Sequence, residues 1–293
     1  MKKSQALRNI LYSAEVSYAM EAHNGMSAKI AQEAGFSVIW GSGFTISSSQ
    51  GHRDCNEISW TDFCHQIEYM ADCTSVPLLV DGDTGFGNFN NVRQLVLKLC
   101  KLGIGGVCIE DKMFPKANSF LPCEHPLVSI DEFAGKIKAA KDSQLDEHFC
   151  VVARTEALIA NLGLEEAIRR AYAYKEAGAD AILIHSKKST IIEIEQFCEQ
   201  WDHSIPLIIV PTKYPNTSSE EFQKLGISLV IWANHLFRAS VKAMRETARH
   251  IYAQSSIKFI HHDISSLDEI FTLVNQSELE EAELKYRASY AKT

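Results

Sequence analysis

The sequence has no basic cluster, no C-x-x-C pair and no long uninterrupted apolar stretch. Its 29 lysine and arginine residues are outnumbered by 37 aspartate and glutamate residues, and adjacent lysines occur only at Lys2-Lys3 and Lys187-Lys188. Proteins that bind nucleic acid or an anionic membrane surface concentrate positive charge on one face. The composition therefore argues against nucleic acid and membranes as partners.

Polar residues interrupt every apolar run in the first segment, MKKSQALRNILYSAEVSYAM. A signal peptide needs an apolar stretch of about 7–15 residues and a membrane-spanning helix needs about 20, so neither is expected here. The eight cysteines are scattered through a chain long enough to build a core without disulfides. We therefore expect reduced, mostly buried cysteines and a cytoplasmic protein.

Fibrous and disordered classes are excluded, because the chain has only 15 glycines and 7 prolines and is 46% hydrophobic. Short runs rich in valine, isoleucine and leucine recur, each followed by a polar or glycine-rich turn and a segment with helical apolar spacing. The eight runs are 16–20, 36–40, 77–81, 106–110, 150–154, 181–185, 207–211 and 229–233. Continuous rather than alternating apolar runs are typical of parallel strands covered by helices.

Glycines at the ends of the intervening helical segments support this interpretation: Gly35, Gly103, Gly178 and Gly226 each precede a strand run. Eight such units predict an α/β fold of the closed (β/α)8 TIM type, with residues 1–293 as a single domain and an open doubly wound sheet as the alternative. A helix from about Leu236 to Gln254 is expected to close the barrel.

A further amphipathic helical stretch runs from Ser266 to Tyr286, within a C-terminal extension spanning 266–290. Its apolar residues include Leu267, Ile270, Phe271 and Val274. Because the barrel is already complete before this point, we expect the apolar face to pack against a neighbouring subunit.

Acidic residues gather where the predicted strands end, which in this type of barrel is where chemistry takes place. Asp81 and Glu110 end two neighbouring runs, Asp83 follows two residues after Asp81, and Asp54 lies in the loop after the second run. A single polar residue at a strand end is ordinary. Four carboxylates together repel one another unless they are protonated or bridged by a cation, and oxygen ligands suit Mg²⁺ or Mn²⁺.

Positive and donor groups occupy other strand ends. Arg154, His185, Lys116 and Lys112 can face a shared ligand, and the backbone of Gly41-Ser42-Gly43 can donate hydrogen bonds to an oxyanion, with Trp40 beside it. Together with a metal, these groups indicate a small, multiply anionic ligand. The run DGDTGFGN lacks the G-x-x-x-x-G-K-[ST] pattern of a phosphate loop. We interpret His261-His262-Asp263 as solvated surface rather than a metal site.

Several segments together resemble one known family. They are MEAHNGMSAKIAQEAGF, WGSGF, RDCNE, DGDTGFGN, EDKMFPKANS, ARTEALIAN, GADAILIHSKK, VPTKYP and IWANH. The most specific is Glu110-Asp111-Lys112, followed after five residues by Asn118-Ser119, which resembles the pattern E-D-K-x5-N-S. On these residues the chain is similar to the phosphoenolpyruvate mutase branch of the isocitrate lyase superfamily.

The resemblance implies a role for each matched position. Asp81 would bind Mg²⁺ directly, and Asp54, Asp83 and Glu110 would act largely through metal-bound waters, with Asp54 also essential to catalysis. Substrate would be bound at Trp40, Ser42, Gly43, Phe44, Ser119, Arg154 and His185, of which Arg154 and His185 would also be catalytic. Lys116 and Asn118 would be catalytic residues on a mobile gating loop that also carries Ser119.

The implied reaction interconverts phosphoenolpyruvate and phosphonopyruvate, the first step of phosphonate biosynthesis, in a homotetramer that exchanges C-terminal helices. Hydrolysis of phosphonopyruvate is the alternative, although that relative has threonine where this chain has Asn118. Lyases of the superfamily carry a cysteine in a K-x-C-G-H segment, which reads KANSF here. A non-catalytic barrel is disfavoured by the polar strand ends.

The chain departs from the family pattern at three places: Phe44 replaces leucine, Gly82 replaces alanine, and the loop after Ser119 reads FLPCEHPL rather than a version with D-G-R.

Overall fold

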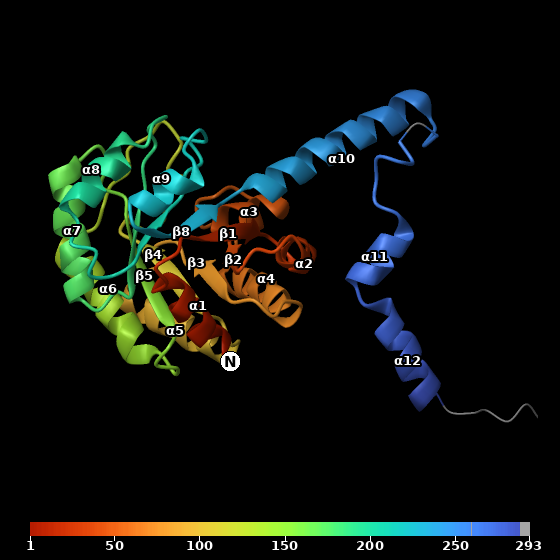
Figure 1. The fold of residues 1–293 in the computed structure, drawn as a ribbon, viewed down its shortest axis with the longest axis horizontal. Coiled ribbons are helices and arrows are strands. Elements are labelled where there is room, and N and C mark those ends of the chain that lie inside the picture. The colour runs from red at the N-terminus through yellow and green to blue at the C-terminus, as the bar shows by residue number, and fades with distance from the viewer. Residues whose placement is uncertain (259, 288–293) are drawn as a thin grey trace, which may run out of the picture. The chain divides into compact units, whose positions relative to one another are not determined.

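The computed structural model describes residues 1–258 and 260–287. Within them, eight parallel strands form a closed barrel in which each strand pairs with its neighbours in sequence and β1 also pairs with β8 (Figure 1). The strands are β1 (Ser17–Ala22), β2 (Val38–Gly41), β3 (Leu78–Asp81), β4 (Gly106–Glu110), β5 (Cys150–Thr155), β6 (Ala181–Ile184), β7 (Leu207–Ile209) and β8 (Ile227–Trp232). The predicted (β/α)8 barrel is confirmed, and each apolar run overlaps one strand.

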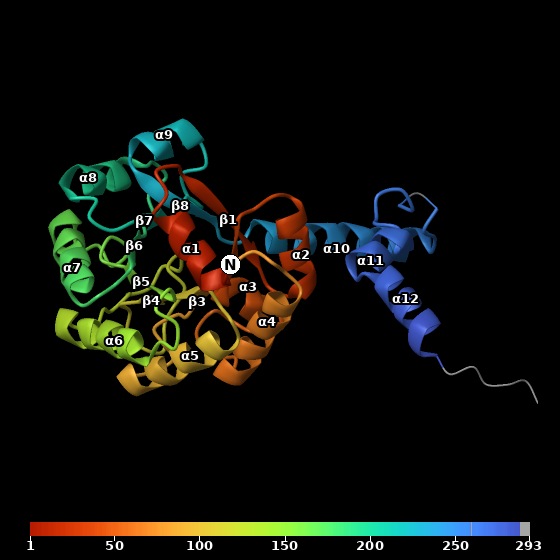
Figure 2. The same ribbon diagram turned by 60° about the horizontal axis from the view of Figure 1, so that its bottom comes forward.

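Helices surround the barrel between successive strands (Figure 2). They are α2 (Gly25–Glu33), α3 (Gly43–Ser49), α4 (Trp60–Asp72), α5 (Phe89–Lys101), α6 (Ile130–Ser143), α7 (Leu164–Glu176), α8 (Ile192–Gln200) and α9 (Ser219–Lys224). Local chemistry sets their ends: the side chains of Asn24, Ser59 and Ser129 accept backbone N–H groups at helix starts. The four glycines expected to end helices have φ values between 67° and 101°, a left-handed conformation that glycine adopts without steric cost.

A first helix, α1 (Lys3–Leu11), closes the N-terminal end of the barrel. Leu7 and Leu11 are completely buried and pack in the same interior cluster as Trp40. Leu7 lies against Gly106 at the start of β4, where an added Cβ would stand 2.6 Å from the carbonyl oxygen of Cys150. Because apolar side chains fill this end, polar groups inside the barrel are confined to the opposite, C-terminal end of the strands.

The internal contacts divide the chain into two compact units, Met1–Phe237 and Arg238–Thr293. The expected helix after β8 is present as α10 (His235–Gln254), but none of its residues is buried, whereas each of α2 to α9 has buried residues. That this helix closes the barrel stays a prediction. Amphipathic spacing predicts a helix correctly but does not identify what the apolar side packs against.

The expected C-terminal stretch forms two helices, α11 (Leu267–Leu273) and α12 (Gln276–Tyr286), rather than one. Asn275 has a φ of 58°, in the left-handed region, which ends one helix before the next begins. Residues 288–290 of the expected extension lie outside the described residues.

Two further expectations concern cysteines and membranes. All eight cysteines are free; Cys64, Cys108, Cys150 and Cys198 are buried, three are half-buried, and Cys123 is exposed. Among the described residues, no helix is both long and apolar enough to span a membrane.

Candidate active site

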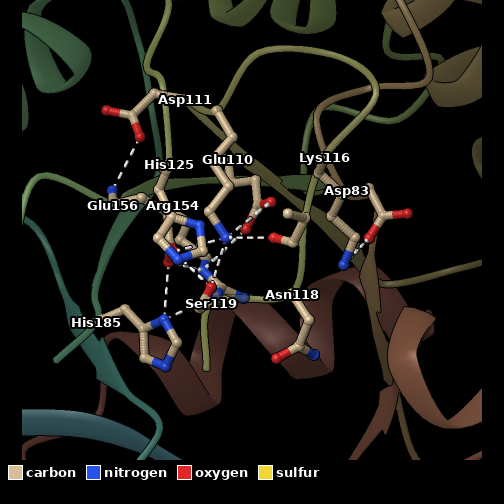
Figure 3. Close-up of polar contacts among 12 residues, drawn as sticks. Asp83, Glu110, Asp111, Lys116, Asn118, Ser119, His125, Arg154, Glu156 and His185 are labelled. Carbon is tan, nitrogen blue, oxygen red and sulfur yellow. Dashed lines mark hydrogen bonds and ion pairs between the residues drawn. The ribbon is translucent and has the colours of Figure 1, made fainter. Parts of the chain in front are cut away.

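Charged side chains converge at the C-terminal end of the barrel (Figure 3). Asp81 ends β3, Glu110 ends β4, Arg154 is the second-to-last residue of β5, and His185 directly follows β6. Asp81, Glu110 and His185 are each less than 8% exposed. The strand ends predicted from the apolar runs therefore do meet at one place, as parallel strands in a closed barrel require.

Lys116 joins two of the expected metal-site carboxylates. Its Nζ lies 2.8 Å from Asp54 Oδ1 and 2.8 Å from Asp83 Oδ1. Burial disfavours the ionised form of Asp54, but Lys116 and Asn118 outweigh it and lower the pKa of that carboxyl. Burial raises the pKa of Asp83 to about 8, with the neighbouring Asp81 and Asp54 acting in the same direction against Lys116.

Asp81 and Glu110 have weaker partners. The Asp81 carboxylate accepts the backbone N–H groups of Gly43 and Asp83, each at 3.3 Å, and burial raises its pKa. Glu110 Oε2 lies 3.2 Å from Arg154 Nε, while Glu110 Oε1 is buried without a hydrogen bond and has Lys112 Nζ 3.7 Å away. The Asp81 and Glu110 carboxylates therefore keep bonding capacity for a ligand or cation.

The site holds more carboxyl groups than cations. When ionised, the carboxylates would outnumber the cations; they are Asp54, Asp81, Asp83, Glu110 and Glu156, against Lys112, Lys116 and Arg154. A divalent cation would offset this excess of negative charge. Within the described residues no group of three or more His, Cys, Asp or Glu side chains forms a ready-made metal site. The buried, unpartnered Glu110 Oε1 and the weakly held Asp81 carboxylate fit a hydrated cation with few protein ligands, which is how Mg²⁺ is usually bound.

Segment 112–127, which connects β4 to α6, contacts the site at the C-terminal end of the barrel. Asn118 Nδ2 donates to Asp54 Oδ2 at 2.7 Å, and the Asn118 side-chain oxygen accepts the Phe120 N–H at 3.0 Å. Ser119 Oγ accepts a hydrogen bond from Lys112 Nζ at 2.5 Å. The structure thus brings Lys116, Asn118 and Ser119 to the carboxylates and cations, where the sequence expected them.

Arg154 and His185 lie together at the ends of β5 and β6. Arg154 Nη2 lies 3.2 Å from Ser119 Oγ and 2.8 Å from His185 Nδ1. His185 Nε2 is buried and has no hydrogen-bond partner among the described residues. Burial lowers the pKa of His185, opposed by Glu156 and reinforced by Arg154. An acceptor atom of a bound anion can satisfy Nε2 when the imidazole carries a proton there.

The turn after β2 is more occupied than the sequence suggested. The Ser42 N–H donates to the Ala22 carbonyl oxygen and the Gly43 N–H donates to Asp81, so both amides already have acceptors. Ser42 Oγ caps α3 by accepting the Thr45 N–H at 3.3 Å. At Gly43 an added Cβ would stand 2.9 Å from Asp83 Oδ1, which explains why glycine is needed beside the carboxylates. Phe44 packs edge to face on Phe237, and Trp40 packs inside the barrel.

Three residues important to this arrangement had no assigned role in the sequence analysis. Asn56 Nδ2 donates to Asp83 Oδ2 at 2.8 Å, and its side-chain oxygen accepts the Lys116 N–H at 2.9 Å. Glu156 contacts both Arg154 and His185. Asp111, within the E-D-K pattern, bonds instead to Arg170 and Tyr174. Successive side chains of a strand point to opposite faces, so Glu110 and Asp111 are expected to have different surroundings. Residues two apart share a face, so Glu156 is expected on the same face as Arg154.

Comparisons with known proteins agree with one another. The family model described as phosphoenolpyruvate phosphomutase matches residues 7–252. The phosphoenolpyruvate phosphomutase of Tetrahymena pyriformis is 50% identical over 286 residues, covering 97% of this chain and 95% of that protein. The crystal structure of a phosphoenolpyruvate phosphomutase from Streptomyces platensis subsp. rosaceus has a TM-score of 0.96 at 40% identity, covering 98% and 100% of the two chains. A phosphonopyruvate hydrolase in complex with oxalate and Mg²⁺ has a TM-score of 0.93 at 42% identity, with the same coverage.

Proposed function

The chain belongs to the phosphoenolpyruvate phosphomutase family, and from that premise we propose that it interconverts phosphoenolpyruvate and phosphonopyruvate. In this reaction the bond between phosphorus and the enol oxygen breaks and a bond between phosphorus and the methylene carbon forms. No proton or water is gained or lost. The observation that carries the proposal is the contact of Asn118 with Asp54, which places segment 112–127 over a site containing both Arg154 and His185.

The cofactor in this proposal is Mg²⁺, or Mn²⁺ in its place. Asp81 would hold the ion directly, and Asp54, Asp83 and Glu110 would orient its water ligands. Support comes from the excess of carboxylates over cations and from Glu110 Oε1, a buried oxygen without a hydrogen bond. When bound, the cation offsets the negative charge that develops on the pyruvate oxygen during phosphoryl transfer.

The chain's own groups bind the two anionic ends of the substrate. Arg154 and His185 Nε2 contact the phosphoryl group and hold it while it changes partners, since a metaphosphate-like group needs positive charge around its oxygens. The pyruvate part is bound by Ser42, Gly43, Phe44 and Ser119, and Trp40 lines the pocket beside them. Because the Ser42 and Gly43 amides already have acceptors, binding there exchanges those partners for substrate oxygens.

Exclusion of water decides between isomerisation and hydrolysis. A phosphoryl group in transit would be captured by water to give phosphate and pyruvate. Asn118 and Lys116 hold segment 112–127 against Asp54 and thereby keep water out during transfer.

Phosphorus NMR of phosphonopyruvate incubated with the purified protein, with and without Mg²⁺, tests the proposal. We expect phosphoenolpyruvate to form only when the metal is present, and restoration of the reaction when Mg²⁺ is returned to EDTA-treated protein. Release of inorganic phosphate in place of phosphoenolpyruvate would instead identify a hydrolase.

We further propose a homotetramer, a dimer of dimers, in the cytoplasm. Leu267, Ile270, Phe271 and Val274 of the second unit form one apolar side of α11 and its end, and each is at least 36% exposed. Such a surface needs a partner in water, and a second copy of the chain supplies one. The eight free cysteines suit a reducing compartment.

A further inference from the structure

Glu156 is a completely buried carboxylate directly after β5. Arg154 Nε donates to its Oε1 at 2.6 Å, and His185 Nδ1 lies 2.8 Å from the same oxygen. Its other oxygen, Oε2, lies 3.0 Å from Lys112 Nζ and accepts the Ser119 hydroxyl at 2.6 Å. One side chain therefore contacts β5, the residue after β6, and both the start and the middle of segment 112–127 (Figure 3).

The charge of Glu156 is set by these neighbours. Burial disfavours the ionised carboxyl, but Arg154, Lys112 and His185 outweigh burial and hold the pKa of Glu156 well below its usual range. A buried anion with this many donors is fixed in one orientation, because moving it would leave charged groups unpaired. The donors are fixed with it.

Glu156 contacts only some of the polar atoms of His185 and Arg154. It contacts Nδ1 of His185 and leaves the buried Nε2 without a partner. It also contacts Nε of Arg154, while Nη2 of that guanidinium points toward Ser119 and His185. Glu156 therefore leaves His185 Nε2 available to a substrate.

Ser119 connects this arrangement to the covering segment. Its hydroxyl accepts from Lys112 and from Arg154 and donates to Glu156. Because the neighbouring Asn118 holds Asp54, one dipeptide contacts both the carboxylate side and the cation side of the site.

We propose that Glu156 is a positioning residue, which orients Arg154 and His185 toward the phosphoryl group and provides the docking point for Ser119 when segment 112–127 covers the site. The phosphoryl assignment in this inference rests on the proposed function. The positioning itself rests on the contacts of Glu156 alone.

Turnover of the variant Glu156→Gln is the first test. The amide keeps the size of the side chain but loses the charge and presents N–H groups to donors. We expect kcat to fall by about 10- to 100-fold, as is usual for groups that orient others in a site. Mg²⁺ affinity should change far less, because Asp81 has no contact with Glu156 and Glu110 keeps both of its partners, Arg154 and Lys112. Glu156→Asp, which keeps the charge, recovers part of the loss.

Glu166→Gln, the same change at an arginine-paired carboxylate on α7, is the control and stays within about twofold of wild type. Wild-type turnover in Glu156→Gln overturns the proposal.

A double-mutant cycle with Ser119→Ala tests the docking role. If Ser119 acts through Glu156, the double variant is no slower than Glu156→Gln alone, whereas independent roles give multiplied losses and overturn it. Ser119→Ala keeps every charge and so remains informative if Glu156→Gln fails to fold. In that case Ser119→Ala by itself must lower kcat more than it raises KM, because a residue that only binds substrate acts mainly on KM. Unchanged turnover, or a change in KM alone, overturns the proposal.

The titration of His185 followed by proton NMR needs no turnover. Its signal is assigned from the spectrum of His185→Gln. Glu156 stabilises the imidazolium, so its loss moves the His185 midpoint to lower pH. Burial lowers the pKa of His185, so a substitution that only loosened the site would move the midpoint upward, toward the ordinary histidine value. An upward or unchanged midpoint overturns the proposal. Failure of the proposed function is seen separately, as wild-type protein that forms no phosphoenolpyruvate.

Discussion

Asn118 is the residue whose side chain joins the covering segment to the carboxylates. Its amide nitrogen donates to Asp54 Oδ2 at 2.7 Å, while its oxygen accepts the Phe120 N–H at 3.0 Å. The first bond needs a donor and the second needs an acceptor, so an amide satisfies both and neither a carboxylate nor an alkyl group can. This pair of requirements explains asparagine at this position.

Two substitutions of Asn118 test that account. In Asn118→Asp a carboxylate faces the Asp54 carboxylate, and in Asn118→Ala both hydrogen bonds are lost. We expect each variant to lose about 100-fold or more in turnover, the usual loss when a donor in a reaction site is removed. Calorimetry should show Mg²⁺ binding close to wild type in Asn118→Ala, because Asp81 is untouched.

Asn90→Ala, on the exposed face of α5, is the matched control and should turn over normally. Wild-type turnover in both Asn118 variants would remove the role assigned to this residue.

The site residues that could be predicted are those at strand ends. Asp81 and Glu110 follow from apolar runs alone, since each run must stop where the chain leaves the core. The role of Glu156 could not be predicted in this way. A buried carboxylate is stable only when it has hydrogen-bonding or charged partners, and those of Glu156 come from the end of β6 and from segment 112–127, far away in sequence. Asn56 was missed for the same reason: its contacts with Asp83 and Lys116 depend on three separate loops.

At the scale of elements, the two acidic residues at the end of β4 have different roles because successive side chains of a strand point in opposite directions. Glu110 faces the barrel interior, whereas the next residue, Asp111, bonds to Arg170 Nη1 at 3.0 Å and to Tyr174 OH at 2.7 Å, both on α7. Asp111 also accepts the Glu156 N–H at 2.8 Å and so links the end of β4 to the end of β5. The same E-D-K pattern therefore supplies a site residue and a structural one.

Asp111→Asn tests the structural role. Arg170 is only 6% exposed and would lose its buried anion, although Glu166 remains 2.8 Å away. Breaking a buried ion pair from one side costs about 3–5 kcal/mol, and we expect the lower end of this range because of Glu166. Urea unfolding should therefore show a lower midpoint.

The control for this experiment is Asp142→Asn, the same change at an exposed position of α6, which should leave the urea midpoint unchanged. Equal midpoints for the Asp111 variant and wild type would show that the pair with Arg170 contributes nothing.

Elements differed in how far the sequence predicted them. Helix ends at Gly35 and Gly178 were predictable, because a left-handed C-terminal residue is a local requirement. The break at Asn275 was not, since asparagine adopts that conformation only in some contexts. The exposure of α10 was not predictable either, because an apolar stripe specifies a need for burial without specifying the partner.

At the scale of the whole molecule, the two units have different surfaces. The unit Met1–Phe237 has a filled barrel as its core, whereas α10, α11 and α12 of the chain have no buried residues. A net charge of -8 keeps copies of the chain apart at long range but is screened beyond about 8–10 Å in physiological salt. Short-range apolar contact can therefore dominate association.

Phe271→Glu tests whether α11 supports assembly. Phe271 is 47% exposed and shares one side of the helix with Leu267 and Val274. A carboxylate buried against apolar groups of another copy would cost several kcal/mol, so the variant should dissociate. We expect sedimentation of the wild type near four times 32.8 kDa and of the variant at a smaller mass. Thr272→Glu adds the same charge on a different side of α11 and should leave the assembly intact. A sharp wild-type monomer would refute the tetramer, and a variant that sediments like wild type would place the contact elsewhere than on this side of α11.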